Sequence, residues 1–403
     1  MINWKTKPLG ELTSFMTKGL APSYVEENTG SAIIVLNQKC NRDYSVSFEN
    51  ARLHDKNRKR VPDEKMLRRY DVLINSTGTG TAGRVAQIRE LPGPTTIDGH
   101  MILLRPTEEI DPLYYGYAIK AYQSYIENLA EGSTGQTEIN KQRLQDEILI
   151  TFPENKLLQS NIVSVLDAID SKIELNAATN ANLEKQALTV YTAWFSKLIP
   201  FGSAVPDSWK TVKLEDICEL ISRGITPKYA DDSNQIVANQ KCIRNHVFDL
   251  AQARTHVPKK INEKWLQFGD LLINSTGEGT LGRTAQVLFE PVNLTVDSHV
   301  TIVRPAKRLY AYYIGLWGMT HEREIEALHT GSTGQTELPR DRVKAMELLL
   351  PDEETLEKFN EVISALSAMS INNQAENAKL AELRDTLLPK LMSGEMDVSE
   401  LDI

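Results

Sequence analysis

Hydrophobic and polar residues alternate in two different ways along the chain. Up to about residue 150, short apolar runs such as AIIVL and HMILLRP are separated by Gly, Pro, Asn and Asp, which is typical of strands joined by turns. Helical patches interrupt these runs, for instance at 113–129. Between Leu157 and Phe195 there is neither Gly nor Pro, and the apolar positions step by four and three, as in a long helix with one apolar seam. The pattern then repeats, so it predicts a globule, a long helix, a second globule and a second long helix.

The apolar seams of the two long helices predict that these helices pair with each other. If the first helix carries the chain to the second globule, the second helix must bring it back, so we expect an antiparallel coiled coil with a pseudo-twofold axis. The expected seam positions are Ile162, Leu166, Ile169, Ile173, Leu183, Ala187, Val190 and Trp194 in the first helix, and Val362, Leu366, Met369, Leu380, Leu383 and Leu387 in the second. Polar residues interrupt the middle of both seams, at Asn176, Asn180, Asn373 and Glu376. Such residues can fix the register of a coiled coil while reducing its stability, or they can be exposed where the helices splay apart.

An internal repeat covers the whole chain. The segment WKTKPLGELTSFMTKGLAPSY, which begins at Trp4, returns as WKTVKLEDICELISRGITPKY from Trp209. NQKC recurs, TIDGHMILLRP returns as TVDSHVTIVRP, and GSTGQTEIN returns as GSTGQTELP. The offset between the copies falls from 205 to 199 positions, which makes each copy a domain-sized unit rather than a solenoid repeat.

The repeat and the periodicity together predict the fold class. We expect an α+β protein with two tandemly repeated mixed α/β domains separated by two long helices that pair as an antiparallel coiled coil. The expected boundaries are 1–153 for the first domain, 154–199 for the first helix, 200–351 for the second domain and 352–403 for the second helix.

Composition describes an ordinary globular protein. Of the 403 residues, 41% are hydrophobic and 25% charged, no stretch approaches the eighteen apolar residues of a membrane span, and the start MINWKTKPLG lacks the apolar core of a signal peptide. The only cysteines are Cys40, Cys218 and Cys242, so we expect a reducing cytoplasm, no disulfide framework and no zinc site. The net charge of −9 argues weakly against nucleic-acid affinity of the whole protein but says little about a local patch.

Two glycine-rich loops are the most prominent part of the repeat. LINSTGTGTAGR spans 73–84 and LINSTGEGTLGR spans 272–283. Neither continues into the Gly-Lys-Ser/Thr of a nucleotide-binding loop, and neither has GxGxxG spacing at a strand-to-helix turn. The loops therefore do not indicate a nucleotide pocket.

The order of motifs resembles a known family. A globule with W…LGE, a GD-LLIN-STG-GT-GR segment and GSTGQT, followed by the helix NIVSVLDAIDSKIELNAATNANLEKQALTVYTAWF, is similar to the specificity (S) subunits of type I restriction–modification systems, the HsdS family. The resemblance covers essentially the whole chain, including its repetition. It implies that each globule is a target recognition domain reading one half of a bipartite double-stranded DNA sequence, and that the helices act as a ruler and as docking surfaces.

The resemblance also implies the partners. Two modification (methyltransferase) subunits would bind S-adenosylmethionine and methylate adenine, and restriction subunits can join them to cleave DNA in bacterial defence. This chain would bind no cofactor and catalyse nothing. The residues agree, since there is no NPPY- or DPPY-like methyltransferase motif, no Walker A sequence and no nuclease-like cluster of carboxylates and lysine. Two alternatives stay open, a self-contained DNA-modifying enzyme and a duplicated scaffold whose loops bind protein or sugar.

The glycine-rich loops are candidates for phosphate contact. Their backbone N–H groups, hydroxyls and arginine could meet DNA phosphates, which position a protein without reading sequence. Alternatively, the glycines serve a tight structural turn with positive φ. The candidate residues are Ser76, Thr77, Gly78, Thr79, Thr81 and Arg84 in the first copy, and Ser275, Thr276, Gly277, Thr280 and Arg283 in the second.

The GSTGQT segments offer base recognition. Gln136 and Gln335 could bond adenine bidentately at N6 and N7 in the major groove, or could fix the loop by bonding backbone groups. If they read bases, the two half-sites should share a letter.

Basic residues lie beside both motifs in both copies. Such residues are usually solvated surface, but their placement here makes DNA contact an equal alternative. They are Lys59, Arg60, Lys141 and Arg143 in the first copy, and Lys259, Lys260, Arg340 and Arg342 in the second.

Two acidic–histidine pairs complete the candidates. Asp98 and His100, like Asp297 and His299, stand two apart in apparent strands and so share a face. We expect structural histidines or phosphate contacts here rather than a metal site, because further ligands are not apparent.

Overall fold

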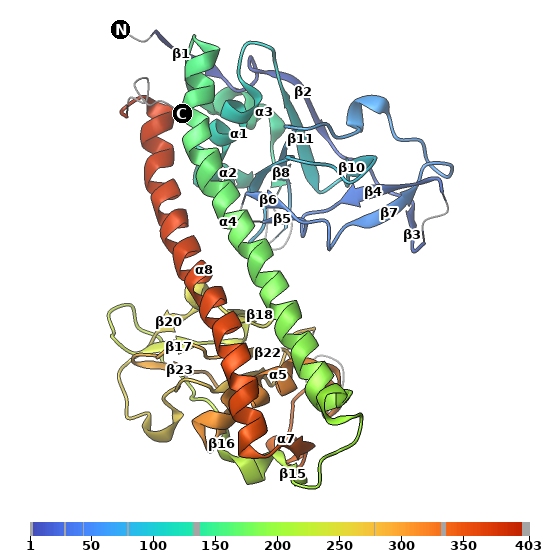
Figure 1. Ribbon diagram of the computed structural model, residues 1–403. Coiled ribbons are helices and arrows are strands. Elements are labelled where there is room, and N and C mark those ends of the chain that lie inside the picture. Colours follow the sequence, from blue (N-terminus) through green and yellow to red (C-terminus); the bar gives the residue numbers. More distant parts are fainter. Residues whose placement is uncertain are drawn as a thin grey trace. The chain divides into compact units, whose positions relative to one another are not determined.

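The computed structural model describes residues 3–27, 30–42, 44–78, 80–131, 138–277, 279–331 and 336–396. The chain forms two compact units, one made of Met1–Ile173 with Ala378–Ile403 and the other of Glu174–Asn377, called here the first and second units. Each unit joins one strand-rich globule to part of each long helix (Figure 1). This division falls within the long helices and does not decide the domain boundaries predicted from the sequence, which stay a prediction.

The globule of the first unit is built on two four-stranded sheets. The first has the strand order β2(Thr13–Lys18), β11(Met101–Pro106), β8(Val72–Asn75) and β9(Val85–Gln87), all antiparallel. The second has the order β10(Thr95–Ile97), β4(Ala32–Leu36), β7(Arg52–Asp55) and β3(Tyr24–Val25), in which β10 and β4 are parallel. Strands β8 and β9 are buried throughout, which explains why they read as continuous apolar runs rather than as alternating ones.

The first unit also contains short ladders and helices. The ladders pair β1(Trp4–Pro8) with β14(Leu149–Pro153), β5(Asn41–Arg42) with β6(Ser45–Val46), and β12(Ala130–Glu131) with β13(Glu138–Ile139). The helices are η1(Asp63–Lys65), α1(Pro112–Ala121), α2(Gln123–Asn128), α3(Lys141–Glu147) and α4(Lys156–Tyr191), the last of which continues into the second unit. Helix α1 begins with proline and is capped by the Asp111 carboxylate, which accepts the backbone N–H groups of Leu113 and Tyr114 at 2.9 and 3.0 Å.

The globule of the second unit repeats this plan. Its main sheet has the order β16(Cys218–Arg223), β24(Val300–Pro305), β21(Leu271–Asn274) and β22(Thr284–Gln286), and its second sheet the order β20(Arg254–Thr255), β17(Ile236–Ala238) and β23(Leu294–Val296). The ladders pair β15(Lys210–Lys213) with β25(Glu347–Leu350) and β18(Ile243–Arg244) with β19(Val247–Phe248). The longer helices are α5(Ala311–Thr320), α6(Glu322–Ala327), α7(Arg340–Lys344) and α8(Glu353–Ser393), the last of which returns into the first unit. The short ones are η2(Thr192–Ser196), η3(Ile199–Phe201), η4(Leu214–Ile217), η5(Gln240–Cys242), η6(Leu250–Gln252), η7(Asn262–Lys264) and η8(Arg308–Tyr310).

Each main sheet is locked by the same buried ion pair. The Asp71 carboxylate accepts Nε and Nη2 of Arg105 at 2.8 and 2.7 Å, and Asp270 accepts the same atoms of Arg304 at 2.8 Å each. Such bidentate pairs hold β11 against the start of β8 in the first globule and β24 against the start of β21 in the second.

Helices α4 and α8 lie side by side and antiparallel within each unit (Figure 1). In the second unit Nδ2 of Asn176 donates to Oε2 of Glu376 at 2.8 Å, and Nδ2 of Asn373 donates to Oδ1 of Asn180 at 2.8 Å. Partners therefore move backward along α8 as they move forward along α4. The expected polar centre of the seam is confirmed for Asn176, which is 3% exposed, and Asn180 and Asn373 are half-buried. Glu376 is exposed, as the alternative predicted.

The seam predicted for α8 is partly wrong. Val362, Met369 and Leu383 are 43%, 53% and 47% exposed. The buried face instead carries Leu356, Phe359, Ile363, Leu388 and Leu391. The buried face of α8 differs from the predicted seam because, in each unit, α8 packs on residues of the globule as well as on α4. Its apolar stripe therefore faces both partners. In α4 the predicted Ile162, Leu166, Ile169, Leu183 and Ala187 are buried as expected.

No helix among the described residues has the length and apolar character needed to cross a membrane.

Candidate nucleic-acid interface

The glycine-rich loop in each globule is a closed turn between two strands. It leaves β8 in the first globule and returns into β9, and the backbone N–H of Asn75 donates to the carbonyl of Arg84 at 3.0 Å across its base. In the second globule Asn274 donates to Arg283 at 2.9 Å in the same way. The two copies therefore have the same shape as well as the same sequence.

Glycine is required at the turn of both loops. Gly78 has φ +105° and Gly277 φ +98°, in the left-handed region that side chains rarely adopt. A Cβ at these positions would lie 2.3 and 2.8 Å from the side-chain oxygens of Gln38 and Gln240. The glycines therefore serve a tight turn with positive φ. Because no side chain stands at Gly78 or Gly277, Gln38 and Gln240 of the NQKC motif can lie against the loop.

Side-chain bonds fix NQKC and the Asp-x-His segment to the loop. The Nδ2 of Asn75 donates to the carbonyl of Gln38 at 3.0 Å, and Oγ1 of Thr77 bonds Nδ1 of His100 at 2.9 Å. The second globule repeats the latter bond between Thr276 and His299 at 2.8 Å. Three motifs far apart in sequence thus meet at one place in each globule.

The acidic residue of each Asp-x-His segment is a structural anchor. Oδ1 of Asp98 accepts the backbone N–H of His100 at 2.9 Å, and Asp297 does the same for His299 at 2.9 Å. Burial raises the pKa of both carboxyls, with the bonds to the histidine N–H opposing it. Within the described ranges no group of three or more His, Cys, Asp or Glu side chains is arranged to hold a metal ion.

The hydroxyl candidates divide into buried and accessible ones. Ser76 and Ser275 are fully buried, and Oγ of Ser275 bonds Oγ1 of Thr301 at 2.6 Å, so neither hydroxyl can reach DNA without rearrangement. Thr77 and Thr276 are half-buried at the histidine. Thr81 and Thr280 bond carbonyls of their own loops at 3.3–3.4 Å, and Nη2 of Arg84 donates to the carbonyl of Gly80 at 3.0 Å. Thr79 lies outside the described residues.

The basic candidates also differ in availability. Nε of Arg143 donates to Glu147 at 2.6 Å and its Nη1 pairs with Glu131, and these carboxylates raise the pKa of Arg143. The positive charge of Arg143 is therefore largely compensated by carboxylates. Arg342, by contrast, bonds only a backbone carbonyl among the described contacts, at 3.1 Å. Lys141 and Arg340 are the first residues of α3 and α7. In the upstream clusters Lys59 and Lys259 each bond a backbone carbonyl at 2.8 Å, and Arg60 and Lys260 are exposed.

The residues that follow each GSTGQT segment are hydrogen-bonded to the glycine-rich loop. Gln136 and Gln335 lie outside the described residues. Directly after them, the backbone N–H of Ile139 donates to the carbonyl of Ser76 at 2.9 Å, and Leu338 donates to Ser275 at 2.9 Å. The chain on the far side of each glutamine is therefore hydrogen-bonded to the loop.

A groove beside the second loop was not anticipated from the sequence. It encloses about 400 Å³ and is lined by polar side chains that include Tyr229, Gln240, Lys241, Arg254 and His299. The sequence did contain a signal for this groove, since the dipeptide Ala-Arg stands at equivalent positions of the two repeats, 51–52 and 253–254.

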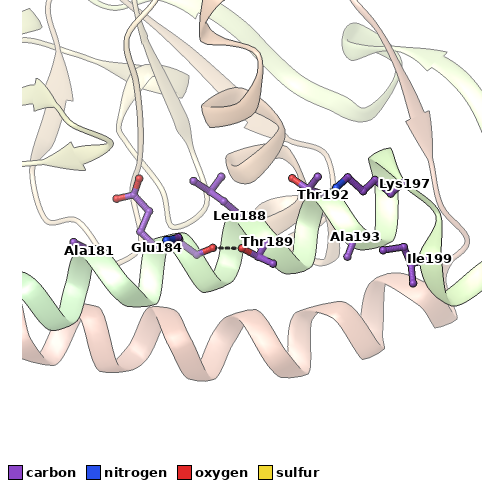
Figure 2. A pocket seen from close by; sticks show the side chains of 9 residues that line it. Ala181, Glu184, Leu188, Thr189, Thr192, Ala193, Lys197 and Ile199 are labelled. Atoms are coloured by element: carbon purple, nitrogen blue, oxygen red, sulfur yellow. Dashed lines mark hydrogen bonds between the residues drawn. The ribbon is translucent and has the colours of Figure 1, made fainter. Parts of the chain in front are cut away.

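A second groove, of about 510 Å³, lies along the end of α4 in the second unit. Figure 2 shows its lining side chains. They include Glu184, Lys185, Leu188, Thr192, Lys197 and Ile199. Ile199 is 61% exposed, so this groove carries accessible apolar surface between charged side chains.

Comparisons with known proteins agree with this duplicated architecture. The family model for the type I restriction modification DNA specificity domain matches residues 1–185 and again 206–383. Over 317 residues, covering 72% of this chain and 69% of the relative, the chain is 27% identical to the type I restriction enzyme MjaIX specificity subunit of Methanocaldococcus jannaschii. It is 20% identical to the type I restriction enzyme HindI specificity subunit of Haemophilus influenzae, over 98% of this chain and all of the relative.

A solved structure shows the same fold. The crystal structure of the S subunit of a type I restriction–modification system from M. genitalium matches with a TM-score of 0.56 and 16% identity, covering 99% of this chain and 97% of that one. The predicted fold class and family resemblance are confirmed, and the scaffold and self-contained-enzyme alternatives are not favoured. Since the family model covers both halves of the chain, this protein belongs to the type I restriction–modification DNA specificity family, the non-catalytic subunits that give these systems their DNA target specificity.

Proposed function

We propose that each globule reads one half of a bipartite double-stranded DNA target and that the paired helices set the spacer between the halves. The observation that carries this proposal is the repeated assembly of glycine-rich loop, NQKC, Asp-x-His and GSTGQT flank in both globules. Contacts to phosphate need no sequence information, so the same assembly can serve two different half-sites.

The proposed phosphate contacts are the accessible members of the predicted set. They are the loop backbone at Gly78 and Gly277, and the side chains of Thr77, Thr276, Arg84, Arg283, Lys59, Arg60, Lys259, Lys260, Lys141, Arg340 and Arg342. Gln136 and Gln335 remain the proposed adenine readers. Ser76 and Ser275 are left out because they are buried.

The proposed partners are two modification subunits that bind S-adenosylmethionine and methylate adenine in the cytoplasm, with restriction subunits joining for cleavage. The cofactor would be held by the modification subunits and not by this chain. We place one docking contact at the α4 groove of Figure 2, whose lining combines the exposed Ile199 with the charged residues Lys185, Lys197 and Glu184. An apolar patch with a charged rim is the usual composition of a protein interface.

The test is co-purification of the tagged chain from its host, combined with single-molecule methylation sequencing of the genome with and without its gene. Recovery of a methyltransferase partner and loss of one bipartite adenine-methylation motif upon deletion would support the proposal and identify the target. An absent partner together with an unchanged methylome would contradict it.

The ruler is tested by removing one heptad from each helix around Asn176 and Glu376. Seven residues correspond to about 10 Å of helix, or about three base pairs of duplex. The methylated motif should therefore keep its half-sites and shorten its spacer by about three base pairs. Altered half-sites would show that the helices contribute to base recognition and are not only a spacer.

A further inference from the structure

An arginine is stacked on a tyrosine at the rim of the 400 Å³ groove in the second globule. Cζ of Arg254 lies 3.7 Å from the ring centroid of Tyr229. Both side chains are exposed, and among the described residues Arg254 forms no ion pair with a carboxylate. Stacking holds the guanidinium in one plane and leaves its N–H groups available to donate. Little conformational entropy is therefore lost when the arginine binds an oxyanion.

The other polar groups of the groove provide mainly unused donors. Nζ of Lys241 and Nε2 of His299 have no hydrogen-bond partner in the described part of the chain. Asn239 is already satisfied, since its Oδ1 accepts the backbone N–H of Lys241 at 2.8 Å and its Nδ2 donates to a backbone carbonyl at 2.9 Å. The only carboxylate of the lining, Asp297, is 4% exposed and accepts a backbone N–H. A lining with cationic donors and few accessible acceptors suits an anionic, acceptor-rich ligand.

The first globule contains the same group of residues. Cζ of Arg52 lies 3.4 Å from the ring centroid of Tyr24. Lys39 follows the same Asn-Gln pair, and the backbone N–H of His100 is bonded to the buried Asp98. A set that is identical in two globules cannot by itself distinguish two different half-sites, so it fits the part of DNA that does not vary.

The groove is continuous with the glycine-rich loop. Thr276 of the loop bonds His299 of the lining at 2.8 Å, and the side chain of Gln240 lies against Gly277. One DNA strand can therefore contact the loop and the groove in succession.

From this geometry we infer a phosphate-binding site for the DNA backbone at Arg254, Lys241 and His299, with a twin at Arg52, Lys39 and His100. The inference rests on the proposed function and deepens it, because it assigns binding of the DNA backbone to residues that lie outside the glycine-rich loop. Stacked Arg254 and Arg52 are the principal ligands, and the adjacent Lys and His extend the donor set.

The experiment measures how DNA affinity depends on salt. The full chain, purified with its modification partner, is titrated by fluorescence anisotropy against a labelled duplex that carries the methylated motif. Loss of one phosphate contact lowers the slope of log affinity against log salt by about 0.9. We expect this change for R254Q, for K241Q and for R52Q, about twice this change for R254Q combined with R52Q, and no change of the methylated sequence in any of them.

R308Q is the matched control. Arg308 is also stacked on an aromatic ring, with its Cζ 4.0 Å from the Phe268 centroid, and it belongs to the same globule. It pairs with Glu290 at 3.2 Å and does not line the groove. Its slope should equal that of the unmodified protein.

Four outcomes separate the possibilities. An unchanged slope in R254Q and K241Q, with melting temperatures equal to that of the unmodified protein, would overturn the phosphate site. An altered methylated half-site in R254Q would overturn it too, because the arginine would then read a base. If R254Q fails to fold, the exposed Lys241 carries the test alone. If the unmodified complex does not prefer its motif, the proposed function fails, while the salt slope on any duplex still tests the phosphate site.

Discussion

The two units are alike around the glycine-rich loop and different where each globule packs on the helix pair. In the first unit Tyr44 lies under Lys120, whose Nζ is 4.1 Å from the ring centroid, and Lys120 faces Asp170 at 3.6 Å. In the second unit His246 lies between Glu184 and Glu322, at 2.5 and 3.5 Å. Tyr44 and His246 are structural counterparts, since both have positive φ and each bridges an alanine of the strand that follows the loop, Ala86 and Ala285.

This difference indicates what the duplication has preserved. If the proposed function holds, residues around the loop contact the DNA backbone, which both globules share, so a change in one copy would not be compensated. The junction residues Lys120, Asp170, His246 and Glu322 are bonded within their own chain, where a new bonding partner can accompany each change. The units should therefore respond differently to changes at the junction and alike to changes at the loop.

The largest expected difference concerns Asp170→Asn. Asp170 accepts Tyr117 at 2.7 Å and Arg384 at 2.9 Å and faces Lys120. Its neutralisation leaves the mostly buried Lys120 without the carboxylate that faces it and leaves Arg384 paired with Asp385 alone among the described contacts. We expect the first unit to lose about 3 kcal/mol of unfolding free energy. Hydrogen exchange combined with urea unfolding would localise this loss.

Glu184→Gln is the matched change in the second unit. Glu184 is 35% exposed and shares His246 with Glu322, so its removal should lower stability by no more than about 1 kcal/mol. Equal losses in the two variants would contradict the distinction between the junctions.

A pH series should separate the units next, beginning with His246. Bonds to Glu184 and then Glu322 raise the pKa of His246 to about 9. A raised pKa gives stability that is complete below the unfolded value of about 6.5 and lost as pH rises through about 9. The second unit should thus lose on the order of 2 kcal/mol between these limits. Urea midpoints at several pH values would measure it, and His246→Asn should remove the dependence.

Lys120 predicts the opposite sign for the first unit. Burial lowers the pKa of Lys120 to about 8. Because the folded protein releases this proton at lower pH than the unfolded chain, the unfolding free energy should rise from about pH 8 towards 10.5. Below about pH 9 the unfolding free energy should rise by only on the order of 1 kcal/mol. Lys120→Met should abolish it, and a stability that falls with pH in both units would show that Lys120 does not titrate this way.

Repetition in the sequence singled out the glycine-rich loop, NQKC and Asp-x-His, and the structure brings these three segments together in each globule. That they bind DNA stays a prediction. Repetition could not show that Ser76 and Ser275 are buried, since their loop begins as a direct continuation of a core strand. The stacking of Arg254 on Tyr229 joins residues 25 positions apart, and no local period signals it.

The α8 seam failed for a related reason. A heptad pattern assumes one apolar partner, but Phe359 packs on Phe195 at the end of α4, at a centroid distance of 4.8 Å, and also belongs to the same apolar cluster as the globule residues Tyr313 and Leu348. This second partner rotates the buried stripe and exposes Val362 and Met369. In the middle of the helix pair, by contrast, Asn176, Asn180 and Asn373 are bonded between α4 and α8 as the sequence predicted.

The smallest expected effect on stability concerns the glycine-rich loop, which the two units share. Gly80 and Gly279 have φ +72° and +69°, with nothing within 4 Å of a Cβ built on either. Replacing either by alanine should therefore add only the strain of the left-handed conformation, about 1 kcal/mol, in its own unit. Gly93 is the control, because it also has open space but no positive φ, so Gly93→Ala should leave stability unchanged or raise it slightly. Urea unfolding of the three variants measures these values, and a loss confined to one of the two loops would mean that the loops have diverged as the junctions have.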